Sequence, residues 1–122
     1  MAKILVTEDE DIVLETMQIM LEEGGNAVTC AANGREALQF LADGPYDLII
    51  TDIVMPEVDG LELLTEVRKR YPDIKIIAVS GGGRISANDY LQTANVLGAD
   101  AVMPKPFSMS DLISAVKQVL AA

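Results

Sequence analysis

The sequence predicts a single α/β domain in which a parallel sheet is covered by helices on both faces. Short apolar runs alternate with longer amphipathic segments five times along the chain, a pattern typical of strand–helix units joined by crossover connections. The 122 residues are enough for one domain with its own core, and half of them are hydrophobic. We find no internal repeat, linker or low-complexity segment, so residues 1–122 are expected to form one domain.

The predicted strands are five apolar runs of four or five residues. Because proline cannot donate to a sheet ladder, Pro104 in the last run indicates a strand that lies at an edge or ends there. The doubly wound, flavodoxin-like strand order 2-1-3-4-5 places the fifth strand at an edge, and we expect this order. The runs are Lys3–Thr7, Ala27–Ala31, Asp47–Thr51, Lys75–Val79 and Ala101–Pro104.

The five amphipathic segments are predicted helices. Gly24 ends the first helix and Pro72 ends the third, whose last turn carries basic residues that suit the helix dipole. Ser108 and Ser110 are both candidate N-caps for the last helix. The helices are expected at residues 11–23, 34–43, 61–71, 86–97 and 108–120. The first is expected to carry its apolar residues on one face: Ile12, Val13, Met17, Ile19, Met20 and Leu21.

The composition excludes several classes of protein. A net charge of −10 argues against duplex nucleic acid as a partner. The chain has no histidine, which excludes histidine metal ligands and general bases. Its one cysteine, Cys30, cannot form an internal disulfide and is expected to be a small core residue.

The ends and the apolar runs give expectations about location and domain content. No apolar run approaches the roughly 20 residues that span a membrane, and no signal stretch opens the sequence. We therefore expect a cytoplasmic protein. The last predicted helix finishes close to the C-terminus, so no output domain is expected.

Charged and hydroxyl side chains follow the predicted strands at their carboxyl ends. Open α/β sheets place their chemistry at this edge, where the ends of neighbouring strands meet. Three carboxylates suit Mg²⁺, which prefers oxygen ligands, and an ammonium and a hydroxyl suit a phosphoryl group. The residues are Glu8, Asp9, Asp52, Ser80 and Lys105.

This set could support phosphoryl transfer to a carboxylate. Asp52 could act as the nucleophile, since carboxylates form acyl phosphates in some proteins. Such transfer depends mostly on positioning and charge neutralisation, which a metal ion and Lys105 could supply, while Ser80 could donate a hydrogen bond. Taken singly, each residue has an ordinary alternative: a solvated acidic loop, a turn serine or a surface lysine. Jointly, complementary groups at four strand ends favour a site.

The whole sequence resembles the receiver domains of two-component response regulators. The resemblance rests on the acidic pair in 4–10, on Asp52-Ile53-Val54-Met55-Pro56-Glu57-Val58-Asp59-Gly60, on Ser80, on Gly98-Ala99-Asp100 and on Lys105-Pro106-Phe107. The family pattern, in this order and spacing, is highly specific.

The resemblance implies a stand-alone phosphoacceptor switch that is not a turnover enzyme. Asp52 would accept a phosphoryl group from a phosphohistidine on a histidine kinase or histidine phosphotransfer protein. Ser80 and Lys105 would bind that group, and the output would be a protein–protein interaction or a phosphorelay. The Lys105–Pro106 peptide would be cis. Mg²⁺ would be held by Glu8, Asp9, Asp52 and the backbone carbonyl of Val54.

Three departures from the family pattern stand out. Glu8 occupies a position where many relatives carry Asp, which is a common variant. Val102 stands where many relatives carry Tyr or Phe, so signalling cannot use an aromatic flip there. The stretch from Ser80 to Lys105 is longer than in compact relatives, and its triple glycine at 81–83 is costly to order.

Rival functions are disfavoured by individual residues. A haloacid-dehalogenase-like phosphatase would need a second Asp at the position of Val54. A flavodoxin would need a phosphate-cradling loop where the acidic run 8–11 would repel phosphate. A binding module with an inert site does not account for the complete set of charged residues.

Overall fold

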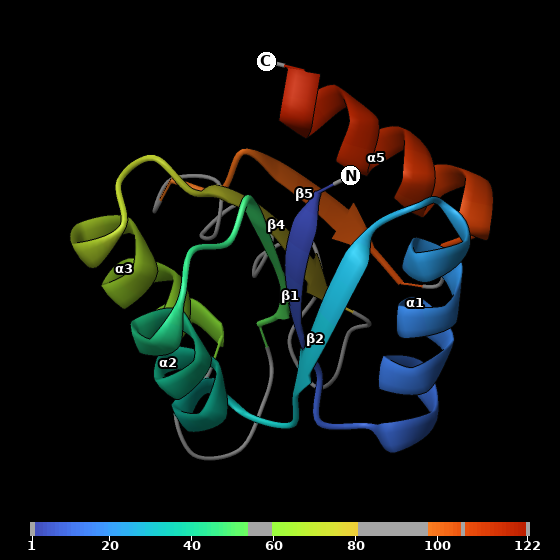
Figure 1. The fold of residues 1–122 in the computed structure, drawn as a ribbon. Coiled ribbons are helices and arrows are strands. Elements are labelled where there is room, and N and C mark those ends of the chain that lie inside the picture. Colours follow the sequence, from blue (N-terminus) through green and yellow to red (C-terminus); the bar gives the residue numbers. More distant parts are fainter. Residues whose placement is uncertain (1, 54–59, 81–97, 106, 122) are drawn as a thin grey trace.

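The computed structural model describes residues 2–53, 60–80, 98–105 and 107–121. Its centre is a five-stranded parallel sheet in the order β2-β1-β3-β4-β5 (Figure 1), which confirms the predicted order and the edge position of the fifth strand. Each strand begins and ends within one residue of the predicted run. The strands are β1 (Lys3–Thr7), β2 (Ala27–Ala31), β3 (Leu48–Asp52), β4 (Lys75–Ser80) and β5 (Ala101–Pro104).

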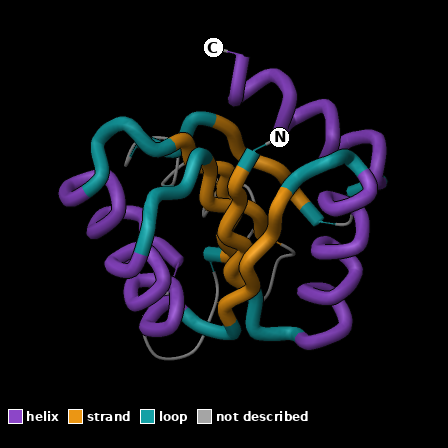
Figure 2. The backbone as a smooth tube through the Cα atoms, in the orientation of Figure 1, coloured by secondary structure: helices purple, strands orange, loops and turns teal. Residues whose placement is uncertain are grey.

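Helices cover both faces of the sheet (Figures 1 and 2). The helices α1 (Asp11–Glu23) and α5 (Met109–Ala121) pack on one face, and α2 (Gly34–Asp43) and α3 (Gly60–Arg70) pack on the other. The helix predicted at 86–97 and the triple glycine before it lie outside the described residues. Within the described residues, no helix has both the length and the apolar character needed to cross a membrane.

The core forms two layers because successive strand residues point to opposite faces. In β1, Leu5 packs with the α2 and α3 side, whereas Ile4 and Val6 pack with the α1 and α5 side. All five residues of the central strand β3 are buried. This continuous burial is expected for a parallel strand that is covered on both faces, and it gives the carboxyl end of the sheet a rigid base.

The prediction that the apolar residues of α1 share one face was wrong for two of them. Met17 and Leu21 are buried, but the side chains of Ile12 and Ile19 are 79% and 55% exposed. Cys30 is half-buried in the edge strand β2 and not part of either core cluster, so its assignment to the core was also wrong.

Local hydrogen bonds fix the starts of two helices. The Asn33 side chain accepts from the Glu36 amide at 2.9 Å and caps α2. Of the two candidates for α5, Ser108 is the cap: its Oγ accepts from the Asp111 amide at 3.0 Å, and Asp111 Oδ2 accepts from the Ser108 amide at 3.2 Å. This reciprocal capping pair satisfies two amides that the helix itself cannot, and it fixes where the chain leaves β5.

Candidate functional site

Three carboxylates meet at the carboxyl edge of the sheet. Thr7 of β1 is paired with Thr51 of β3, so the residues that follow β1 lie beside the end of β3. One carboxylate oxygen from each of Glu8, Asp9 and Asp52 lies within 4.8 Å of the others. The structure therefore brings together the three acidic side chains that the sequence singled out.

Lys105 joins this cluster from the edge of the sheet. Its Nζ donates to Glu8 Oε2 at 2.6 Å and to Asp52 Oδ2 at 2.9 Å. Since β4 lies between β3 and β5, the lysine side chain reaches across the end of β4 to make these contacts. The sequence predicted that Lys105 would belong to the site, but its direct pairing with Glu8 was missed. No sequence signal specifies which oxygen a lysine will contact.

Burial controls the ionisation of the cluster. Glu8 is fully buried, and this burial, aided by the nearby charge of Asp52, raises its pKa to about 7 against the opposing effect of Lys105. Burial lowers the pKa of Lys105, but hydrogen bonds to Glu8 and Asp52 outweigh it, and the net shift is upward. Lys105 is therefore held as a cation, whereas Glu8 is poised to lose or gain a proton near neutral pH.

The donor set fits a small divalent cation. Three carboxylates against one ammonium leave excess negative charge in a partly enclosed space, and Mg²⁺ prefers carboxylate oxygens together with water. Asp9 is exposed, whereas Glu8 and Asp52 are buried, so the cluster has one open side. A divalent cation there would keep Glu8 ionised.

Two hydroxyl groups next to the site were missed by the sequence analysis. Thr51 Oγ1 donates to the backbone carbonyl of Asp52 at 2.9 Å and so ties down the end of β3. Thr7 Oγ1 is buried and has no hydrogen-bond partner among the described residues. A threonine ending an apolar strand is the one signal that could have pointed to them.

Three predicted elements of the site lie wholly or partly outside the described residues. Ser80 is the last residue of β4 and is paired in register with Pro104, which puts its backbone beside the site, but its side chain lies outside the description. Val54, whose carbonyl was predicted as a ligand, lies outside the described residues. Pro106 does too, so the predicted cis peptide is untested.

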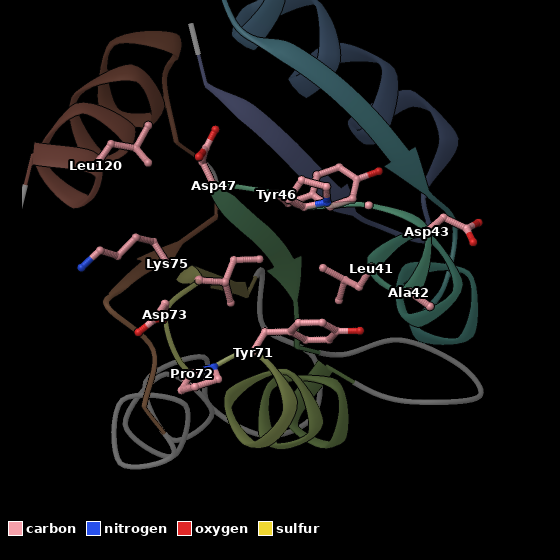
Figure 3. A pocket seen from close by; sticks show the side chains of 13 residues that line it. Leu41, Ala42, Asp43, Tyr46, Asp47, Tyr71, Pro72, Asp73, Lys75 and Leu120 are labelled. Carbon is pink, nitrogen blue, oxygen red and sulfur yellow. The ribbon is translucent and has the colours of Figure 1, made fainter.

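Two hollows of the surface lie at different distances from the site. A hollow of about 700 Å³ lies at the opposite, amino edge of the sheet, where Tyr46, Tyr71, Pro72 and Asp73 are among its lining residues (Figure 3). None of the clustered site residues contributes to it. A smaller apolar hollow of about 250 Å³ borders Lys105 itself, and is lined by Ile12, Val13, Thr16, Met17, Met20 and Phe107.

Comparison with known proteins identifies relatives of two lengths. The chain is 35% identical to the response regulator receiver protein CpdR of Brucella abortus (strain 2308), with 100% of this chain and 99% of CpdR covered. It is 44% identical to part of the sensor kinase CckA of the same organism, with 98% of this chain but only 12% of the kinase covered. It also spans about half or less of several regulators that it matches.

Solved structures of receiver proteins are also similar to this chain. The chain superimposes on the response regulator TrrA of Thermotoga maritima, determined in complex with Mg²⁺–BeF, with a TM-score of 0.86, 35% identity and 98% and 99% of the two chains covered. A receiver domain protein from Clostridium thermocellum gives a TM-score of 0.91 at 32% identity, covering 99% and 95%.

The sequence matches the response regulator receiver domain family over residues 4–117. This is a family of signalling proteins and not of turnover enzymes. The acidic cluster and Lys105 lie together at the carboxyl edge of a sheet with the strand order 2-1-3-4-5, as the match leads one to expect. The chain belongs to the response regulator receiver domain family of two-component signalling.

Proposed function

We propose that the protein is a phosphoacceptor switch that is phosphorylated on Asp52. The observation that carries this proposal is the position of Lys105 Nζ, 2.9 Å from Asp52 Oδ2, in a cluster of three carboxylates. A carboxylate nucleophile beside a fixed cation and a divalent-cation site is the arrangement that phosphoryl transfer requires.

The transfer follows from the charges in the cluster. A carboxylate oxygen of Asp52 attacks the phosphorus of a phosphohistidine; an O–P bond forms as the N–P bond breaks, and the imidazole leaves with the electron pair. The Lys105 ammonium exchanges its contact with Asp52 for a phosphoryl oxygen and offsets the negative charge there. A bound Mg²⁺ would neutralise further phosphoryl charge. Glu8, Asp9 and Asp52 would hold it, together with the carbonyl of Val54.

Ser80 is proposed to donate a hydrogen bond to the phosphoryl group. Its backbone lies at the end of β4, between the strands that carry Asp52 and Lys105, which supports this role. Val102 is 37% exposed on the edge strand, at the position where many relatives carry an aromatic residue. We therefore propose that the signal of phosphorylation passes through β5 itself and not through the flip of an aromatic side chain.

The proposed partners are proteins. The phosphodonor would be a histidine kinase or a histidine phosphotransfer protein, since two-component receivers work with such donors and the chain matches part of a sensor kinase. The output would be a protein–protein contact or a phosphorelay, without nucleic acid, in the cytoplasm. The net charge of −10 supports the exclusion of nucleic acid.

The proposal is tested by intact-mass spectrometry after incubation with acetyl phosphate and Mg²⁺. We expect a phosphate-sized adduct on the wild type that disappears with Asp52→Asn or with a metal chelator. Asp43→Asn is the matched control, because Asp43 lines the hollow at the opposite edge of the sheet. A folded wild type that binds Mg²⁺ but forms no adduct would favour a binding module with an inert site.

A further inference from the structure

The side chain of Arg68 holds three separate segments together at the amino end of β5. Its Nη1 donates to the carbonyl oxygens of Pro72 and Ile74, both at 2.9 Å. Its Nη2 donates to the carbonyl oxygen of Gly98 at 2.7 Å and to Asp100 Oδ2 at 2.9 Å. We call these five residues the Arg68 clamp; it joins the end of α3, the start of β4 and the segment that enters β5.

Asp100 connects the clamp to the sheet. Its backbone amide donates to the Ile76 carbonyl at 2.8 Å, and its Oδ2 accepts from the Ile76 amide at 2.8 Å. The Asp100 carboxylate therefore accepts from the Ile76 amide and from the Arg68 guanidinium at once, one residue before the first pairing of β4 with β5, that of Ile77 with Ala101. The position at which β5 begins is thus set by a side chain from α3.

Gly98 shows how closely the chain passes Arg68. Its φ of +108° is in the region that favours glycine, and a Cβ at this position would lie 3.2 Å from Arg68 Nε. The entry to β5 is therefore shaped around the guanidinium.

The ladder between β4 and β5 carries this position on to Lys105. The Ile53 amide donates to the Val79 carbonyl, so Val79 faces β3 and the next residue, Ser80, faces β5. Ser80 is paired with Pro104, so the nitrogen of Pro104 faces away from β4, where the missing amide hydrogen of proline costs no ladder bond. Among the described residues this four-residue strand pairs with β4 alone, so the clamp is a second attachment beside that ladder.

We propose that Arg68 is a positioning residue for Lys105. By fixing the start of β5, the clamp sets where Lys105 stands roughly 17 Å further along, at about 3.3 Å per residue. The Arg68–Asp100 pair alone would contribute little, because both side chains are about 30% exposed. The bonds to three carbonyls use the rigid fork of arginine donors, which lysine cannot reproduce. This inference rests on the proposed function, in which Lys105 binds the phosphoryl group.

The first measurement needs no phosphodonor. Amide hydrogen exchange at Met103 and Lys105 is compared in wild type, Arg68→Met and Arg70→Met. Arg70 is the matched control, since it lies on the same helix, is 60% exposed and pairs only on the surface with Glu66 at 3.0 Å. We expect exchange to be about tenfold faster with Arg68→Met and unchanged with Arg70→Met. Equal exchange in the wild type and Arg68→Met would overturn the proposal.

The second measurement is a double-mutant cycle on beryllofluoride affinity in the presence of Mg²⁺. Arg68→Met is expected to weaken binding about fivefold in the wild type and to have no effect when Lys105 is already Met, because a positioning residue acts only through the group that it positions. An equal loss in both backgrounds would show a merely structural role.

Two provisions keep the outcomes separable. If Arg68→Met does not fold, Asp100→Asn is used, which retains the shape of the clamp but removes one charge; a smaller change in the same direction is expected. If the wild type binds no beryllofluoride, the proposed function fails, whereas the exchange measurement still decides whether the clamp positions β5.

Discussion

The two cationic side chains that flank β5 are held by different kinds of partner. Arg68, before the strand, binds three backbone carbonyls and one carboxylate. Lys105, after it, binds two buried carboxylates. Backbone carbonyls cannot be exchanged for another ligand, whereas an ammonium can leave a carboxylate for a phosphoryl oxygen. The contacts of Arg68 at the start of the strand are therefore fixed, whereas those of Lys105 after its end can change.

The largest expected effect concerns the pH dependence of the functional end. The folded-state pKa of Glu8 is raised from 4.5 to about 7, so the folded protein holds a proton that the unfolded chain releases between these values. Its contribution to the free energy of unfolding is fully present below pH 4.5 and lost as pH rises through 7. Without Mg²⁺, this loss is expected to be about 3 kcal/mol.

This is measured by urea denaturation of wild type and Glu8→Gln from pH 4.5 to 8 in the presence of a metal chelator. The difference in unfolding free energy between wild type and Glu8→Gln should change with pH by the amount that the Glu8 contribution loses. Asp9→Asn, which alters an exposed side chain, should show the same pH dependence as the wild type. Mg²⁺ should reduce the dependence by favouring the ionised carboxylate. A difference that does not change with pH would contradict the assigned protonation of Glu8.

The next effect separates the two ligands that Lys105 influences. Lys105→Met removes a cation from beside Asp52, so Mg²⁺ affinity should rise about tenfold because one positive charge no longer opposes the ion. Beryllofluoride affinity should fall about 100-fold, since a charge-assisted hydrogen bond is lost. Titration calorimetry at saturating Mg²⁺ measures the second quantity. If both affinities fell together, Lys105 would be a structural part of the pocket and not a ligand-exchanging group.

A smaller effect is expected near the start of β5. Gly98→Ala imposes a left-handed conformation on alanine and brings its Cβ within 3.2 Å of Arg68 Nε, so we expect a loss of about 1–2 kcal/mol in stability. Thermal unfolding measures this. Gly25→Ala is the control, because its φ is +89° but no atom lies within 4 Å of the added Cβ. Equal losses of stability in the two variants would mean that backbone strain alone is the cause and that the contact with Arg68 contributes nothing.

The smallest effect tests the helix that follows β5. Ser108→Ala removes the oxygen that caps α5 at 3.0 Å and should cost about 1 kcal/mol, as read from chemical denaturation. Ser110→Ala, at the rejected cap position, should change stability little. Neither substitution touches the charges on Lys105, so beryllofluoride affinity should stay the same; a large loss would mean that the cap and the site are coupled.

The sequence was informative wherever local chemistry determines structure. The five strands, the edge position marked by Pro104 and the meeting of Glu8, Asp9 and Asp52 follow from apolar runs and from the shared edge of parallel strands. The helix faces were predicted less well: Ile12 and Ile19, two turns apart, lie on the side of α1 opposite Met17 and Leu21 and remain exposed.

The Arg68 clamp could not have been predicted from the sequence. Arg68 and Asp100 are 32 residues apart, and a basic residue in the last turn of a helix is already explained by the helix dipole. The contact depends on how α3 lies against the entry to β5, which only the tertiary structure supplies. The same holds for the 2.6 Å contact between Lys105 and Glu8.

The brevity of β5 also bears on how the molecule behaves in a crowded solution. An edge strand offers its outward-facing amides to any extended chain, and long, regular edges invite aggregation. Because Val79 faces β3 and is paired with Met103, the outward-facing residues of the four-residue strand are Val102 and Pro104, and proline has no amide hydrogen. One donor makes a poor template, so this edge is too short and too poor in donors to recruit a neighbour's strand.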